Sequence, residues 1–168
     1  MRADNQQERL DSYIAGFVDG EGSFHVAIQK VLHVRFGYQL VPEFQASQNL
    51  DYAKTLEVMK VRLECGYIKP NHAKNSRDKS HVYLVRNRDD LLNKVIPFFE
   101  RNVLLSPKHE DFCKFSSIVK AMHEKLHLER EGFVSLLKIA FSMNRNGIYR
   151  KKNLSVIIKD LESSTTIR

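Results

Sequence analysis

The stretch YIAGFVDGEGSF, residues 13–24, raises the question that the rest of the chain must answer. It places two carboxylates, Asp19 and Glu21, among glycines at the end of an apolar helix. The C-terminal end of a helix carries partial negative charge, so acidic side chains are disfavoured there. Carboxylates beside free carbonyl groups make a poor cap but offer the oxygen ligands that Mg²⁺ prefers. Two interpretations stay open, a cation site and a pair of solvated turn residues.

The helix that precedes these acids, predicted over residues 10–19, has two different faces. Ile14, Phe17 and Val18 form an apolar face. The second stripe, at helical spacing, carries almost no side chain before its last member and consists of Ser12, Ala15, Gly16 and Asp19. Gly inside a helix costs roughly 0.5–1 kcal/mol relative to Ala, so close approach of another backbone would explain it. That backbone belongs either to the same chain or to a second copy.

The totals favour one basic domain. With 168 residues, 27 Lys or Arg and 20 Asp or Glu, the chain carries a net charge of +7. Such a surplus favours a polyanionic partner, although basic proteins without one are common. We expect a single domain over 1–168, with a core of about 10–128 and a helical extension over 129–168.

The sequence gives no sign of secretion or of a membrane. Cys65 and Cys113 are spaced for neither a disulfide framework nor a zinc site. The first ten residues are polar, and no apolar run approaches the ~18 residues that span a bilayer. We therefore expect an intracellular protein without a membrane partner, in a prokaryotic cytoplasm or an organelle.

Hydrophobic periodicity predicts an α+β fold in the order α-β-β-α-β-β-α, followed by further helices. Pro42 places the second strand at an edge or a bulge, and Gly66 is expected to end the second helix. Helices are predicted over 10–19, 51–64, 89–101, 108–128, 131–143 and 154–162, and strands over 24–30, 38–48, 66–70 and 81–86.

The segment IAGFVDGEG, Ile14 to Gly22, resembles the signature of the LAGLIDADG homing endonucleases. The literal matches are Ala15, Gly16, Asp19 and Gly22. Gly20 and Glu21 replace the family's Ala and Asp. A single copy of the motif implies a homodimer whose motif helices pack together and bring one acid from each subunit to the axis. The dimer contacts implied are Ser12, Ala15, Gly16 and Asp19.

The resemblance implies divalent-metal-dependent cleavage of DNA. Bound metal ions can activate the attacking water and stabilise the leaving oxygen without a Ser or Cys nucleophile. Glu21 carries over as the metal-binding acid and the carbonyl of Gly20 as a further ligand, whereas Asp19 is expected to orient. The implied cofactor is Mg²⁺, with Mn²⁺ or Ca²⁺ as substitutes.

Two more catalytic positions follow from the resemblance. Gln48, in FQASQ, matches a polar residue that orders water in the family, although a surface amide is an equally good interpretation. Lys108, in LLSPKHEDF, is the candidate for the basic residue near the scissile phosphate, and Arg101 is its rival.

The strand faces that carry no core residues are expected to read base edges in the major groove, where Gln suits adenine and Lys suits guanine. The alternative for each residue is a solvated sheet face. The candidates are His25, Ala27, Gln29, Gln39, Glu43, Gln45, Ser47, Lys69, Asn71, His81 and Tyr83.

Basic segments are expected to contact phosphates, which position a protein without specifying sequence. Residues 69–88 hold six Lys or Arg against one acid, and RKK occupies 150–152. The phosphate candidates are Lys74, Arg77, Lys79, Arg86 and Lys151. A twofold dimer would prefer a roughly palindromic site of ~20 base pairs.

The sequence thus predicts a site-specific double-strand DNA endonuclease. A maturase-like RNA-binding protein of the same fold without cleavage is the main alternative, and the presence of Glu21 favours the nuclease. A DNA-binding regulator without catalysis is a second alternative. A hydrolase of small molecules fits the basic surface poorly.

Overall fold

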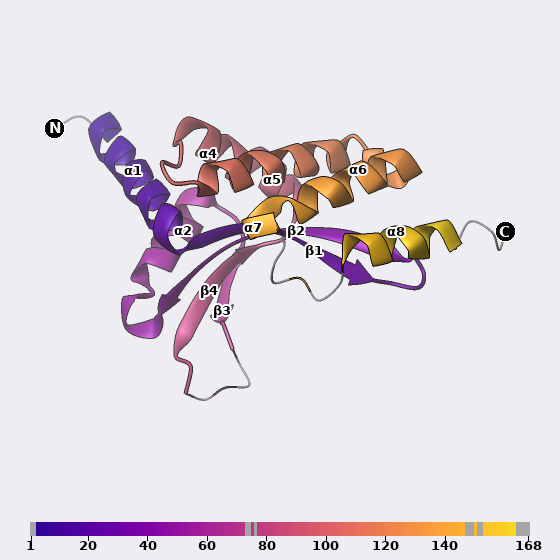
Figure 1. Cartoon of the computed structure of the whole chain (residues 1–168). Coiled ribbons are helices and arrows are strands. Elements are labelled where there is room, and N and C mark those ends of the chain that lie inside the picture. Colours follow the sequence, from indigo (N-terminus) through magenta and orange to yellow (C-terminus); the bar gives the residue numbers. More distant parts are fainter. Residues whose placement is uncertain (1–2, 73–74, 76, 147–149, 151–152, 164–168) are drawn as a thin grey trace. The chain divides into compact units, whose positions relative to one another are not determined.

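The computed structural model describes residues 3–72, 75, 77–146, 150 and 153–163 of the chain (Figure 1). The chain forms two compact units, each built from two separate segments. The first unit comprises Met1–Phe24 and Glu43–Phe112, and the second comprises His25–Pro42 and Cys113–Arg168.

The predicted α-β-β-α-β-β-α order is confirmed, and helices follow it. The longer elements are α1 (Ala3–Glu21), β1 (Gly22–Lys30), β2 (Tyr38–Asn49), α2 (Lys54–Leu63), β3 (Tyr67–Pro70), β4 (Ser80–Val85), α4 (Ile96–Arg101), α5 (Lys108–His123), α6 (Arg130–Phe141) and α8 (Leu154–Ser163). The shorter ones are α3 (Arg88–Asp90), α7 (Met143–Asn146) and the turns Leu50–Tyr52, Leu91–Val95 and Leu126–Leu128.

Two predicted helices are interrupted for local reasons. The helix predicted over 89–101 contains a π-helical turn at Leu91–Val95, directly before Pro97 in the first turn of α4. Pro97 has no N–H to donate to the preceding turn, and such a gap is a common origin of a local distortion. The helix predicted over 108–128 ends at His123, because Lys125 adopts a left-handed conformation with φ 64°.

The sheet has the strand order β1-β2-β4-β3, and β4 is antiparallel to both of its neighbours. Ala46 of β2 lies opposite Tyr83 of β4, and Gln45 lies opposite Leu84. Since successive side chains point to opposite faces, Tyr83 belongs to the same face as Ala46, and Gln45 belongs to the other face.

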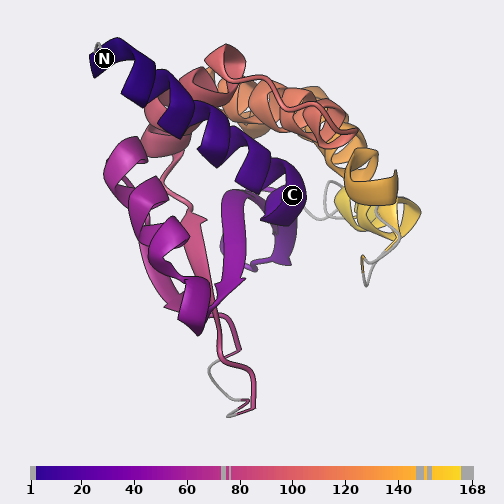
Figure 2. The same ribbon diagram turned by 90° about the vertical axis from the view of Figure 1, so that its left-hand side faces the viewer.

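The first unit is held together by an aromatic cluster. The Phe24 ring lies 5.0 Å from that of Phe44, 5.3 Å from Phe99 and 5.2 Å from Phe112, measured between centroids. The helices α1 and α2 lie side by side (Figures 1 and 2). An ion pair with an N–O distance of 2.7 Å joins Arg62 of α2 to Asp11 of α1.

The second unit packs α6 and α8 with the loop between β1 and β2. The rings of Phe36 and Phe133 lie 5.1 Å apart. Arg150 donates to the carbonyls of Val26 at 3.0 Å and Ala140 at 2.8 Å, and burial lowers its pKa. Arg150 therefore binds backbone carbonyls of its own unit. The expectation that residues 150–152 contact phosphate is wrong for this residue.

The junction between α1 and β1 has no intervening residue, since Glu21 ends the helix and Gly22 begins the strand. A Cβ placed on Gly22 would lie 2.5 Å from Cγ1 and 2.7 Å from the carbonyl oxygen of Val18. Only glycine fits at that distance, so the sequence requires glycine at this turn.

Candidate active site

Asp19 is bound to the segment that starts α5. Its carboxylate accepts hydrogen bonds from the N–H of Leu105 at 3.0 Å, the N–H of Ser106 at 3.0 Å and the hydroxyl of Ser106 at 2.5 Å. The Ser106 hydroxyl in turn accepts from the N–H of Lys108 at 3.2 Å, as a helix N-cap does. The C-terminal end of α1 thus meets the N-terminal end of α5, where a carboxylate is stabilised.

These contacts govern the acidity of Asp19. Burial alone would raise the pKa of the carboxyl, but the hydrogen bonds from Ser106 and Leu105, together with the charge of Lys108, lower it below its ordinary value. Asp19 is therefore ionised near neutral pH and acts as a bridge between two helix ends.

Lys108 of α5 binds the end of α1, just as Asp19 of α1 binds the start of α5. Its ammonium donates to the carbonyls of Val18 and Asp19, both at 2.8 Å, and to that of Gly20 at 3.3 Å. These are three of the carbonyls that a helix end leaves without intrahelical partners. Burial lowers the pKa of Lys108, while the carboxylates of Asp19 and Glu21 oppose that shift. In this structure Lys108 is the cap of α1.

Glu21 has the opposite surroundings. Its side chain is exposed and makes no direct hydrogen bond or ion pair within the described part of the chain. Gly20 beside it is exposed as well, and no atom lies within 4 Å of the place where its Cβ would be. One chain therefore offers a carboxylate and a carbonyl, the hard oxygen ligands that suit a Mg²⁺ ion that keeps several waters.

The other catalytic candidates, Gln48 and Arg101, have different surroundings. Gln48 is half-buried, and its side-chain oxygen accepts from the N–H of Asn49 at 2.8 Å. Arg101 lines a separate cavity of about 210 Å³ together with Arg62 and Lys94. Of the two basic candidates, Lys108 lies at the C-terminal end of α1, and Arg101 lies at that cavity.

The small-residue stripe of α1 is mostly exposed. Ser12 and Gly16 face outward, and nothing lies within 4 Å of a Cβ added to Gly16. Ala15 of the same stripe is only 8% exposed, so it offers little surface to a second copy. Large apolar side chains are also exposed in this unit, including Tyr13 at 53% and Leu105 at 93%.

Three residues expected to read DNA from the first unit are placed differently. Tyr83 is fully buried and donates to the carbonyl of Cys65 at 2.9 Å, so its assignment is wrong. Glu43 lies on the expected face but is 5% exposed and paired with Arg86, which contradicts its assignment as an open base reader. His81 belongs to the face of Tyr83, at the half-buried end of β4.

The remaining candidates of the first unit are accessible. Gln45, Ser47 and Lys69 share one face of the sheet. Tyr67, 44% exposed, lies on that face too. We did not predict Tyr67; alternation with Lys69 along β3 is the signal that could have identified it.

The loop between β3 and β4 is braced by Asp78. The Asp78 carboxylate contacts His72 and accepts from the N–H of Ser80 at 2.8 Å, and these hydrogen bonds, Ser80 first, lower its pKa to about 2. Arg77 and Lys79 on either side are exposed. Asn71 is also exposed, and Lys74 lies outside the described residues.

The second unit carries the other strand candidates. Gln29 and Gln39 are exposed, and His25 and Ala27 are half-buried. Lys151 lies outside the described residues.

Comparison with known proteins agrees with this geometry. Residues 14–119 match the family model described as LAGLIDADG endonuclease, which begins at Ile14 of the signature helix. The chain belongs to the LAGLIDADG endonuclease family. A "Probable intron-encoded endonuclease 2" of Neurospora crassa is 34% identical over 135 residues, which is 79% of this chain and 29% of that relative. The chain thus spans less than a third of the length of this relative.

Two solved structures of homing endonucleases match over nearly their whole length, whereas that of the LAGLIDADG homing endonuclease I-LtrWI bound to target DNA is covered over 45% of its chain. The homing endonuclease I-TnaI has a TM-score of 0.76 and 33% identity, with 91% of this chain and 96% of that one covered. The archaeal intron-encoded I-Vdi141I, complexed with DNA, has a TM-score of 0.84 and 28% identity, with 93% and 96% covered. These relatives carry endonuclease names, so the comparisons do not support the maturase-like alternative.

Within the described residues, every helix is too short or too polar to cross a membrane.

Proposed function

We propose that this chain is a site-specific DNA endonuclease that acts as a homodimer and hydrolyses both strands of a long, roughly palindromic target with Mg²⁺. One observation carries the proposal: at the end of the signature helix, Asp19 is used for structure and Glu21 is left exposed beside the Gly20 carbonyl. An exposed acid at a helix C-terminus that accepts no hydrogen bond from the described residues is unfavourable for stability, so a ligand is its best explanation.

Glu21 and the Gly20 carbonyl would hold the metal, and a second copy would supply the same pair. When bound, the metal supplies an activated water and stabilises the charge that develops on the leaving oxygen. Lys108 keeps the Gly20 carbonyl in position and brings a positive charge to the place where a phosphate would approach. Gln48 is proposed to order water for the reaction.

The dimer is proposed to form along Ser12 and Gly16. The lack of side chain at Gly16 allows two helices to approach closely, and the exposed Tyr13 and Leu105 would add apolar area around that contact. Basic residues on the exposed sheet face and the β3–β4 loop, Lys69, Arg77 and Lys79, would contact the DNA.

Cleavage is tested with the purified chain and a pool of duplexes that carry a randomised segment. With Mg²⁺ we expect double-strand breaks at one family of roughly palindromic sites, and with EDTA none. Binding of the same sites in Ca²⁺ without breaks would locate the metal requirement in the chemical step. Failure to cleave any duplex with Mg²⁺ or Mn²⁺ would refute the proposal.

The dimer is tested with Gly16→Leu, measured by sedimentation and by cleavage. A leucine on the stripe would hold the two helices apart, so we expect a folded monomer that does not cleave. Ser117→Leu, at an exposed position on α5, is the matched control and should stay dimeric and active. An active dimer with Leu at position 16 would contradict the proposed interface.

A further inference from the structure

The β1–β2 loop, residues 31–37, is anchored on one side to the turn before α6 and to α6 itself. Arg35 donates to the carbonyl of Leu128 at 2.6 Å. The ring of Phe36 packs against that of Phe133. These contacts fix the second half of the loop and leave its first half, around Leu32, unsupported by them.

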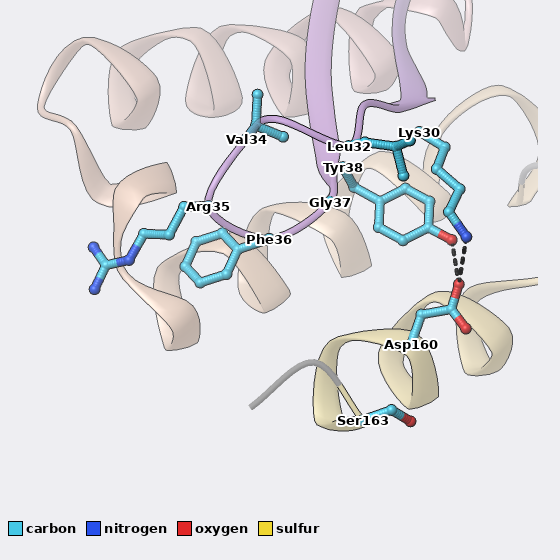
Figure 3. Close-up of a pocket in the computed structure, with 9 residues that line it drawn as sticks. All are labelled: Lys30, Leu32, Val34, Arg35, Phe36, Gly37, Tyr38, Asp160 and Ser163. Atoms are coloured by element: carbon cyan, nitrogen blue, oxygen red, sulfur yellow. Dashed lines mark hydrogen bonds and ion pairs between the residues drawn. The ribbon is translucent and has the colours of Figure 1, made fainter. Parts of the chain in front are cut away.

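The other side of the loop is anchored to α8 through one carboxylate. Tyr38 donates its hydroxyl hydrogen to Asp160 at 2.5 Å, and the ammonium of Lys30 lies 3.6 Å from the same oxygen (Figure 3). Lys30 ends β1 and Tyr38 begins β2, so Asp160 joins the two strands where the loop leaves them. Burial, and then the bond to Asp160, raise the pKa of Tyr38, so the phenol keeps its proton at neutral pH.

A cavity of about 410 Å³ lies between the loop and α8 (Figure 3). Because this space is open, the loop is not supported here by continuous side-chain packing. Inside the loop, the N–H of Val31 donates to the carbonyl of Gly37 at 2.9 Å, and the N–H of Gly37 donates to the carbonyl of Val34 at 2.9 Å. The loop therefore keeps its own turn, and its placement against α8 depends on the contacts that Asp160 makes with Tyr38 and Lys30.

The side chains that the loop presents are suited to DNA. Leu32 is 80% exposed, and Lys30 keeps 54% of its side chain exposed although it is paired. Apolar side chains contact the methyl group of thymine in the major groove, and cations contact phosphates. An apolar residue held out beside a cation fits the edge of a base pair next to the backbone.

We propose that Asp160 of α8 is a positioning residue for target recognition, which orients the β1–β2 loop so that Leu32 meets a defined set of base pairs. This inference rests on the proposed function in DNA cleavage. It gives the C-terminal helix a part in sequence discrimination without any contact of its own with DNA.

The test measures binding by fluorescence anisotropy in Ca²⁺, with the selected target and with each of its single base-pair variants. Leu32→Ala first identifies the positions that the loop reads. At those same positions, Asp160→Ala should reduce discrimination about three- to tenfold, the size of coupling that contacting residues show, and elsewhere leave it within about twofold. Asp160→Asn, which keeps an acceptor for Tyr38, should give an intermediate result, and the exposed Glu162→Ala on the same helix should change nothing.

Four outcomes would overturn the inference. Leu32→Ala could leave every position unchanged, or Asp160→Ala could lower the melting temperature without altering discrimination, which would make Asp160 merely structural. Absence of DNA binding by the wild-type chain would refute the proposed function together with this inference. Binding and cleavage with discrimination unaltered in Asp160→Ala would refute this inference alone.

Discussion

Asp19 and Glu21 are the two carboxylates at the C-terminal end of α1, and their surroundings are opposite. Asp19 accepts hydrogen bonds from two backbone N–H groups and a hydroxyl, whereas Glu21, two residues later, accepts none from the described residues. The two acids of the signature therefore have different tasks: the first connects helix ends, and the second remains available to a ligand.

The difference also shows how a helix C-terminus can tolerate an acid. Asp19 escapes the unfavourable end of its own helix because its carboxylate faces the N-terminal end of α5, and Lys108 neutralises the carbonyls that remain. Glu21 accepts no hydrogen bond from the described residues and interacts with Lys108 through its charge without direct contact, so its replacement should affect chemistry and leave the fold intact.

The largest effect is expected for Glu21→Gln. Loss of the anionic metal ligand should remove several kcal/mol of transition-state stabilisation, which corresponds to a loss of cleavage on the order of a thousandfold. The melting temperature should stay the same or rise slightly, because an acid at a helix C-terminus is removed. Cleavage rates and thermal unfolding measure the two effects, with the exposed Glu131→Gln on α6 as control. Undiminished cleavage would remove Glu21 from the site.

Asp19→Asn should affect the fold first. Hydrogen bonds to a charged acceptor contribute more than neutral ones, so we expect the free energy of unfolding to fall by about 2 kcal/mol. Denaturant titration measures it. An unchanged free energy of unfolding would show that the junction between α1 and α5 does not depend on this carboxylate.

The same residue predicts a pH dependence. Since the folded-state pKa of Asp19 lies below the ordinary value of 3.8, its contribution is complete above that value and is lost as the pH falls through the folded-state pKa. The difference in stability between the wild type and Asp19→Asn should therefore be constant near neutral pH and shrink in acid. A difference that persists unchanged below pH 3.8 would contradict the cause given for it.

Lys108→Met should have an intermediate effect. It removes the ammonium from three carbonyls at the end of α1, and we expect a loss of about 1–2 kcal/mol in the free energy of unfolding. Lys114→Met is the control, since Lys114 donates to a single carbonyl, that of Ser142 at 3.0 Å. Equal losses of unfolding free energy in the two variants would mean that contact with three carbonyls stabilises the fold no more than contact with one.

The smallest effect is expected for Ser106→Ala, which removes both the N-cap of α5 and one donor to Asp19. Replacement of a serine N-cap typically costs about 1 kcal/mol. The backbone N–H groups of Leu105 and Ser106 still donate to Asp19 in this variant, so we expect the total loss to stay near that value. Thermal and chemical unfolding of Ser106→Ala and of Ser117→Ala, whose hydroxyl bonds only within its own helix, would separate the cap from a general loss of a hydroxyl.

The order of helices and strands could be predicted from the sequence because each element has its own period. The signature of α1 and the alternation of Phe24 with Val26 belong to single elements, and both predictions are confirmed by burial. The orientation of β4 could not be predicted, because Val82, Tyr83, Leu84 and Val85 are all apolar and all buried. With no polar residue between them, their period does not say which side faces the core.

The network at the α1 tip could be predicted only in part. Glu21 and Gly20 follow from the signature, but the contact between Asp19 and Ser106 joins residues 87 positions apart. Periodicity carries no signal for such a contact, and the same is true of Tyr38 and Asp160, 122 positions apart. Lys108 is predicted as a basic residue near the scissile phosphate, and the structure shows that it caps the C-terminal end of α1.

The junction at Gly22 has a consequence for fidelity. The residue proposed to hold the metal and the first residue of a strand proposed to read DNA are consecutive, with no residue between them. If a mismatched base pair shifts β1, we expect Glu21 to move with it. Such a sequence would then be bound tightly but cleaved slowly. Insertion of one glycine after Glu21 would decouple the two events, and cleavage would then lose its extra selectivity over binding.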